Sequence, residues 1–151
     1  MLNDVYYGQM IALAITMRRQ TMSIIVDLYV KHLNKQVEKY WNIYHFDMEP
    51  GHCSYNNEGD AFKHTYMQAE LALFLGQKIA KYIGDKHEDR PDNPPGEKKM
   101  DLHNNAIGRL IASGIKAHDF FWFLKWPIDD KIADKVMQNM NEGLLITKPV
   151  E

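Results

Sequence analysis

The chain has 151 residues, the size of one compact domain, and its 18 basic and 20 acidic side chains give a formal net charge of −2. This balance lacks the positive excess of nucleic-acid-binding proteins, and a single cysteine, Cys53, excludes a disulfide framework and a four-cysteine zinc site. Hydrophobic residues form 45% of the chain, enough for a packed core, so we expect one globular domain over residues 1–151 with no nucleic-acid partner.

An apolar stretch, residues 10–30, lies near the start of the chain. Its uninterrupted part covers only residues 10–17 before two arginines, whereas a membrane-spanning helix needs about 20 apolar residues. No basic segment precedes it and no small-residue cleavage site follows it. We therefore expect no transmembrane segment and no signal peptide, and a protein that is cytoplasmic or exported by a non-standard route. Apolar residues at helical steps from Ile11 to Leu33 predict an amphipathic helix instead.

The irregular residues 46–57 separate this helix from a second one. Helical periodicity predicts that the second helix runs from about residue 57 to Ile83, with Gly84 as its C-terminal stop. Residues 85–97 hold three of the six prolines and none of Val, Ile, Leu or Phe, which predicts a loop. We therefore expect a proline-rich loop between the second and third helices.

Two more helices are predicted in the rest of the chain. The third covers about residues 97–114, and the fourth covers residues 128–141, with Pro127 before it and Gly143 after it. The long segments show helical rather than alternating periodicity. The sequence therefore predicts an all-α fold, a single compact domain of about four main helices.

Five aromatic residues fall within the seven positions Phe120–Trp126. On a helix they would point in all directions, so we expect some of them to fill the core or a homo-oligomer interface, where aromatic residues concentrate. The other interpretation is a surface that dips into a membrane interface, since Trp and Phe near a lysine are used in that way. That second interpretation favours a phospholipid or another cell-envelope component as a partner.

Histidines with neighbouring carboxylates occur three times within residues 58–104. Asp60 and His64 are four residues apart, so on a helix they lie on one face and can share a metal ion. His103 and Asn104 fall on the predicted inward side of the third helix, where an unpaired polar group costs about 1–3 kcal/mol. They therefore need a polar partner or a metal ion. The predicted metal ligands are Asp60, His64, His87 and His103, with Asp101 and Asn104 orienting them.

Three segments resemble the motifs of one family of bacterial and phage domains. They are Asp60-Ala61-Phe62-Lys63-His64, His87-Glu88, and Met100-Asp101-Leu102-His103-Asn104-Asn105 followed by Gly108-Arg109. The family carries Asp-Ala-Phe-Arg-His, His-Glu and Met-Asp-Leu-His-Asn-Asn-x-x-Gly-Arg in this order. Its activity is uncharacterised, and its members often lie at the ends of secreted or toxin-like proteins. The resemblance covers about residues 56–112 and implies that the characteristic positions are Asp60, His64, His87, Glu88, Asp101, His103, Asn104 and Arg109.

Imidazole, carboxylate and amide side chains on neighbouring helices suit a metal-assisted hydrolase with its site between the second and third helices. A divalent ion, with zinc as the first choice, would be its cofactor. Glu58 or Glu88 would act as the acid or base, and Arg109 or Lys63 would stabilise an anionic oxygen. We expect a phosphoester or phospholipid as the substrate, with a cell-wall bond second because of the family's toxin-like setting.

Two alternatives stay open. Without a metal ion, His64 or His103 would be the general base, held by Asp60 or Asp101. In a non-enzymatic binding protein, such as a phage or immunity-type factor, the same side chains would form a structural network, and the aromatic segment would bind a partner. The enzyme and the binding protein should respond differently to His64→Ala. The substitution should leave an enzyme folded but inactive, whereas it should lower the Tm of a protein in which these side chains form a structural network.

Overall fold

A computed structural model describes residues 28–46, 55–115 and 126–151. The chain divides into two compact units, Met1–Lys35 and Gln36–Glu151. The first unit is helical where it is described. The second unit contains all the residues that the sequence predicts for the site, from Glu58 to Arg109.

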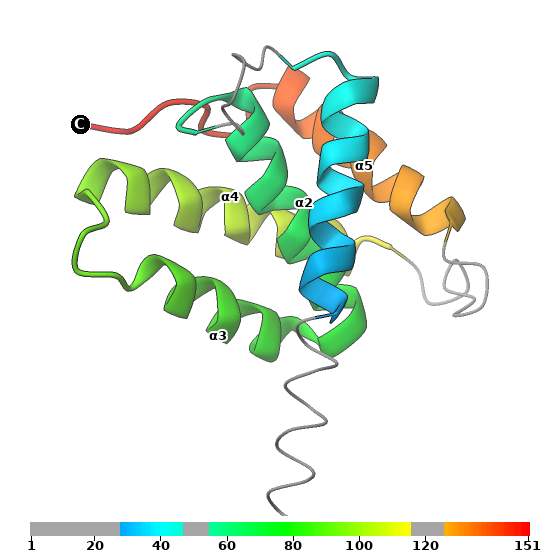
Figure 1. The fold of residues 1–151 in the computed structure, drawn as a ribbon, viewed down its shortest axis with the longest axis horizontal. Helices are drawn as coiled ribbons and strands as arrows, with labels where there is room; N and C mark the ends of the chain where they lie inside the picture. The colour runs from blue at the N-terminus through cyan, green and yellow to red at the C-terminus, as the bar shows by residue number, and fades with distance from the viewer. Residues whose placement is uncertain (1–27, 47–54, 116–125) are drawn as a thin grey trace, which may run out of the picture. The chain divides into compact units, whose positions relative to one another are not determined.

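Every regular element in the described residues is a helix, as Figure 1 shows. The helices are residues 28–43, α2 (Glu58–Leu75), α3 (Gln77–Glu88), α4 (Pro95–Ser113) and α5 (Trp126–Asn141). No strand occurs in this part of the chain, so the prediction of an all-α fold is confirmed. None of these described helices has the length and apolar character needed to cross a membrane.

The predicted second helix is in fact two helices, separated at Gly76. α2 begins after Asn57, whose side-chain oxygen accepts a hydrogen bond from the Asp60 backbone N–H at 3.1 Å and so caps the helix. α2 ends where the Gly76 backbone has a φ of 88°, in the left-handed region that favours glycine. α3 then continues to Glu88, so the predicted helix end at Ile83 is wrong.

The predicted stop at Gly84 is instead a contact between helices. Gly84 is buried within α3, and a Cβ atom built on it would lie 2.7 Å from Gln68 Nε2 of α2. The absence of a side chain therefore allows α3 to pack closely on α2. The proline-rich loop is only residues 89–94, shorter than the predicted 85–97. α4 begins at Pro95, because a proline in the first turn loses no helical hydrogen bond.

α2 packs against α3, α4 and α5, and it presents different faces to its surroundings. Phe62 and Tyr66 lie one turn apart, are fully buried, and belong to the apolar core. The Tyr40 ring packs on this face, with its centroid 5.3 Å from that of Tyr66. Asp60 and His64 lie on the opposite side of the helix, because each helical residue turns by about 100°. α2 thus stands between the apolar core and a polar cluster.

Several sequence predictions concern residues outside the described part of the chain. These residues are the apolar residues 10–27, Cys53 and the aromatic segment Phe120–Trp126. Of the aromatic segment, only the backbone of Trp126 is described, as the start of α5. The proposed roles of these residues in an oligomer or at a membrane surface stay predictions.

Candidate metal centre

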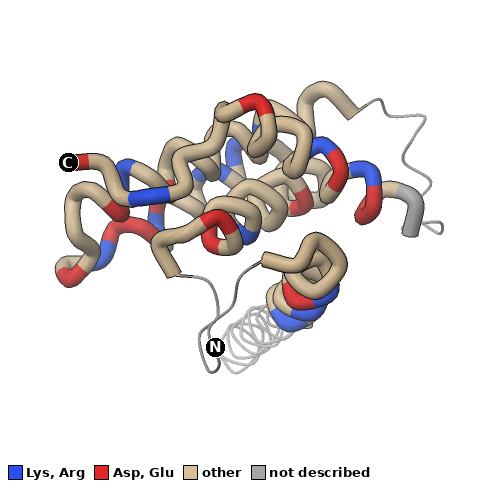
Figure 2. The backbone as a smooth tube through the Cα atoms, turned by 90° about the horizontal axis from the view of Figure 1, so that it is seen from above, with Lys and Arg blue, Asp and Glu red and all other residues tan. Residues whose placement is uncertain are grey.

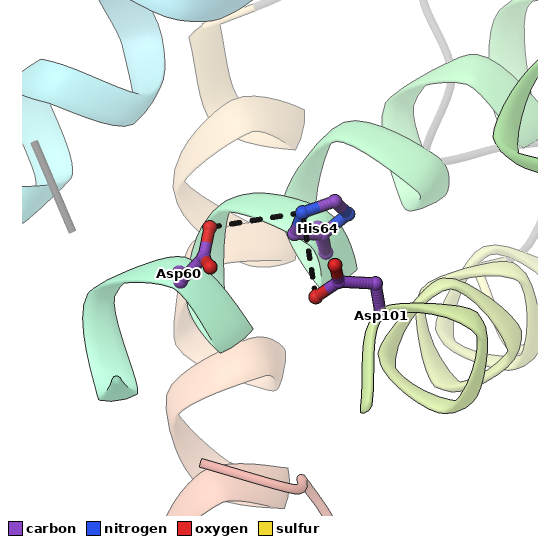
Figure 3. A group of neighbouring side chains, drawn as sticks. All are labelled: Asp60, His64 and Asp101. Atoms are coloured by element: carbon purple, nitrogen blue, oxygen red, sulfur yellow. Dashed lines mark ion pairs between the residues drawn. The ribbon is translucent and has the colours of Figure 1, made fainter. Parts of the chain in front are cut away.

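His64 on α2 lies among buried carboxylates from three helices. Asp60 is one turn earlier on α2, and its Oδ1 is 3.7 Å from His64 Nε2. Asp101, in the second turn of α4, places its Oδ1 3.5 Å from the same nitrogen. Figure 3 shows the two carboxylates directed at one edge of the imidazole ring. Each of the three residues offers one ligand atom within 4.8 Å of the others, a group that could hold a metal ion.

The other edge of the ring faces Glu88 and Asn105. His64 Nδ1 is 3.6 Å from Glu88 Oε1 and 3.4 Å from Asn105 Oδ1. Glu88 is the last residue of α3 and is fully buried, and Asn105 lies one turn after Asp101 on α4. Since α3 and α4 both pack on α2, the end of one and the beginning of the other meet at His64.

The cluster contains more hydrogen-bond acceptors than donors. A neutral imidazole carries one N–H and one lone pair, yet each ring nitrogen of His64 faces two oxygen atoms. Burial lowers the pKa of His64 and favours this neutral form, although the charges of Asp60 and Glu88 act in the opposite direction. Among the described residues of the cluster, two acceptors, Glu88 Oε1 and Asp101 Oδ1, and one donor, Asn105 Nδ2, are buried with no hydrogen-bond partner. A bound cation would compensate these charges.

The crowding of carboxylates also changes how Asp101 titrates. Burial raises the pKa of Asp101 from 3.8 to about 7, and the negative charges of Glu88 and Asp60 act in the same direction. A group whose pKa is raised by folding stabilises the protein below its unfolded pKa and loses that contribution as the pH rises through the folded pKa. Without a cation, the wild-type protein should therefore lose stability between about pH 4 and 7 through this group.

We expect Asp101→Asn to stabilise the metal-free protein above pH 7. The amide does not titrate, so the variant escapes the loss of stability that the ionised carboxylate causes. Its free energy of unfolding at pH 8 should exceed that of the wild type by about 1–2 kcal/mol, allowing for solvent screening. Urea unfolding at pH 4 and pH 8 measures this difference, and equal stabilities at pH 8 would contradict the repulsion among the carboxylates.

Two of the four predicted ligands, His87 and His103, lie outside the group of Asp60, His64 and Asp101. His87 is exposed on α3, and its ring centroid is 6.0 Å from that of His64. His103 is also exposed, with its Nε2 2.8 Å from the Leu144 carbonyl oxygen. The prediction that His103 faces inward is therefore wrong, because it lies beside the inward side of α4 and against the C-terminal segment.

Asn104 is on the inward side of α4, as predicted, but it holds the C-terminal segment and not the cluster. Its Nδ2 donates to the Ile146 carbonyl oxygen at 2.8 Å, and its Oδ1 accepts from the Ile146 N–H at 3.0 Å. The contact to His64 comes instead from Asn105, which was not among the predicted site residues. The available signal was its place in the same Asp-Leu-His-Asn-Asn run.

Glu58 and Arg109 are also outside this group. Glu58 is the exposed first residue of α2. Arg109 donates from Nη1 to Gln68 Oε1 at 3.1 Å, and burial lowers its pKa. Arg109 contributes to a groove of about 530 Å³ between α3 and α4, whose other lining residues are Lys81, Tyr82, Asp85, Lys86, Asp89, Lys98 and Leu102.

The groove is rich in charge, with a surplus of two positive side chains. Its lysines are ion-paired with its aspartates: Lys81 with Asp85, and both Lys86 and Lys98 with Asp89. Figure 2 shows basic and acidic segments alternating where α3 turns into α4. No residue of the cluster lines the groove, although two of its lining residues, Asp89 and Leu102, directly follow Glu88 and Asp101 in the chain.

The chain belongs to a family described as a domain of unknown function, DUF6973, whose sequence profile matches residues 9–144. The match extends through both compact units and includes every residue of the cluster. The expected membership of a family of uncharacterised activity is thereby confirmed, while the toxin-like setting stays a prediction. No solved structure matches the chain.

Proposed function

We propose that this DUF6973 domain binds a divalent metal ion through Asp60, His64 and Asp101 and hydrolyses a phosphoester bond. The observation that carries the proposal is the spacing of the ligand atoms. The separations of 3.7 Å and 3.5 Å between His64 Nε2 and the two carboxylate oxygens are too long for hydrogen bonds. Metal bonds of about 2.1 Å, at the angles of tetrahedral or octahedral coordination, separate neighbouring ligand atoms by about 3.0–3.4 Å. The cluster is therefore close to a ligand arrangement.

The donor set also limits the choice of metal. One imidazole and two carboxylates suit zinc and manganese, whereas the cluster has no thiolate, the ligand that soft metals prefer. Zinc is our first choice because it is commonly held by three such ligands, with one coordination position left for water or substrate. Manganese is the second choice because it favours carboxylate oxygens.

A divalent ion with an open position would lower the pKa of a bound water and polarise a phosphoryl oxygen. The protein side chains would hold the ion in place and transfer the proton that the leaving group needs. Asp60 and Asp101 bring the negative charge that retains the ion, and α2 and α4 hold them in fixed positions. His87, exposed beside His64, is available to exchange a proton with the leaving group.

The groove between α3 and α4 supports an anionic substrate. It is lined by chain neighbours of Glu88 and Asp101 and has a surplus of two positive charges, so it would attract a phosphate group more strongly than a neutral group. Arg109 offers a planar guanidinium whose remaining N–H groups can bind two phosphate oxygens together. A phosphoester therefore ranks above a cell-wall bond, which would need no such charge.

The competing hypothesis is a binding protein whose cluster is only a structural network. Such networks are stabilising when every polar atom is paired. When both carboxyls are ionised, Glu88 Oε1 and Asp101 Oδ1 are buried without a hydrogen-bond partner and do not fit that requirement, whereas a protonated Asp101 can pair with Glu88. Above the raised pKa of Asp101, the two unpaired acceptors therefore favour a cluster that binds a cation.

Metal analysis of the purified, untagged protein beside Asp60→Asn tests the proposal. We expect about one zinc or manganese ion per chain in the wild type, with hydrolysis of a model phosphodiester that a chelator removes. Asp60→Asn should lose both properties, while Asp92→Asn, which changes an exposed loop carboxylate, should keep both. A wild type that binds no metal after incubation with either ion would contradict the site. Metal binding without phosphodiesterase or phospholipase activity would contradict the reaction.

A further inference from the structure

We infer that Asn105 accepts the Nδ1–H of His64 and that the Glu88 Oε1 oxygen beside it favours the proton on this nitrogen, so that the bare Nε2 faces Asp60 and Asp101. The inference rests on the proposed metal site and assigns to Glu88 a positioning role in place of the acid or base role that the sequence analysis gave it. Nδ1 is 3.4 Å from the Asn105 amide oxygen and 3.6 Å from Glu88 Oε1. Both groups are acceptors, so this edge of the ring is suited to the single N–H of a neutral imidazole.

The two edges of the ring are chemically different. The Nε2 edge faces two carboxylates, Asp60 and Asp101, whose combined charge is better compensated by a divalent cation than by one N–H. The Nδ1 edge faces one carboxylate and one neutral amide, which a single N–H can serve. Placing the proton on Nδ1 leaves the Nε2 lone pair where a metal ion needs it.

A second residue fixes the orientation of the Glu88 carboxylate. Asn93, in the loop before α4, donates from Nδ2 to Glu88 Oε2 at 3.0 Å and to the Glu88 backbone oxygen at 3.2 Å. This contact engages one carboxylate oxygen and leaves Oε1 directed at His64. The arrangement matches the common pattern in which a metal-binding histidine donates its other N–H to a carboxylate that sets its tautomer and ring orientation.

The position of Glu88 is otherwise unfavourable, which indicates that it serves the site. It is the last residue of α3, where the partial negative charge of the helix end disfavours a carboxylate. It is also fully buried, and burial disfavours any carboxylate that is not fully paired. The N–H of His64 beside Oε1 and a cation beyond the ring would offset both costs.

Nitrogen NMR of histidine-labelled protein at pH 8, without metal, reads the tautomer of His64 directly. We expect Nδ1 to carry the proton in the wild type and in Glu88→Gln, which keeps an acceptor oxygen. Glu88→Met, of similar size without an acceptor, should shift the population towards the Nε2–H tautomer and weaken zinc binding by about 10–100-fold. A wild type with the proton on Nε2, or a Glu88→Met variant with unchanged tautomer and zinc affinity, would overturn the inference.

Asn93→Ala gives a second test if Glu88→Met does not fold. The substitution removes the hydrogen bond from Asn93 Nδ2 to Glu88 Oε2 and leaves every residue of the cluster unchanged. It should shift the tautomer of His64 in the same direction by a smaller amount. Because the tautomer is measured without metal, a result against the inferred tautomer is distinct from a result against the metal site. A wild type with the expected tautomer but no affinity for zinc or manganese would contradict the proposed function, and normal zinc binding with the wrong tautomer would contradict only the role of Glu88.

Discussion

Replacing Gly108 with alanine is expected to destabilise the protein by about 3 kcal/mol or more, at the upper end of the cost of overpacking. A Cβ atom on Gly108 would lie 2.1 Å from the Thr65 backbone oxygen and 3.0 Å from Gln68 Cβ. The Thr65 carbonyl belongs to the middle of α2 and cannot turn aside, so α4 would have to move away from α2. At about 2–4 °C per kcal/mol for a chain of this size, the Tm should fall by about 6–12 °C.

Two other glycines provide matched controls for this prediction. Gly84→Ala meets the ends of the Gln68 and Asn105 side chains, which can shift more easily than a backbone carbonyl, so its cost should be about 1 kcal/mol. Gly76→Ala meets no atom within 4 Å, and its cost of about 1–3 kcal/mol should come alone from the backbone conformation, with φ of 88° and ψ of 157°, which only glycine adopts readily. Thermal and urea unfolding of the three variants gives the order directly. If Gly108→Ala is no less stable than Gly84→Ala, the close approach of α2 and α4 is wrong.

The second large effect is expected for His64→Ala, which removes the nitrogen ligand of the proposed metal site. Loss of groups that only orient a metal ligand costs about 10–100-fold in affinity, so loss of the ligand itself should cost more than about 100-fold. Hydrolysis that depends on the ion should fall by at least the same factor. Calorimetric titration with zinc, before and after the substitution, measures the first effect, and the phosphodiesterase assay measures the second.

His87→Ala is the matched control, because it removes another imidazole whose ring lies 6.0 Å from that of His64. His87 is exposed and outside the group of three ligands, so its zinc affinity should stay close to the wild-type value. Its activity should fall if it donates a proton to the leaving group. Equal losses of zinc affinity in both variants would contradict the assignment of ligands, and loss in neither would contradict the metal site.

The sequence was sufficient to predict the contact between site residues that are close together in the chain. Asp60 and His64 are one turn apart, and helical periodicity alone places them on one face. The same reasoning predicted a single helix where the structure has α2 and α3, because the helical periodicity continues through Gly76. Glycine permits the positive φ that breaks the helix there but does not require it. The approach of Glu88 to His64 depends on that break and could not be predicted.

His103 and Asn104 show a second reason for the limits of sequence reasoning. Both are polar residues on α4, and both needed polar partners, as the sequence analysis expected. Their partners are the backbones of Leu144 and Ile146, about forty residues later in the chain. Backbone atoms exist at every residue, so no pattern of side chains indicates which of them a distant asparagine will bind.

The twelve residues of α3 extend from the turn at Gly76 to the carboxylate of Glu88. In an α-helix each residue adds about 1.5 Å and turns the next side chain by about 100°. A single insertion or deletion in α3 would therefore carry Glu88 away from the imidazole ring, whereas most substitutions on its exposed side would leave Glu88 in place. We expect natural variants of this domain to differ in length in the loop of residues 89–94 and to keep the length of α3 constant.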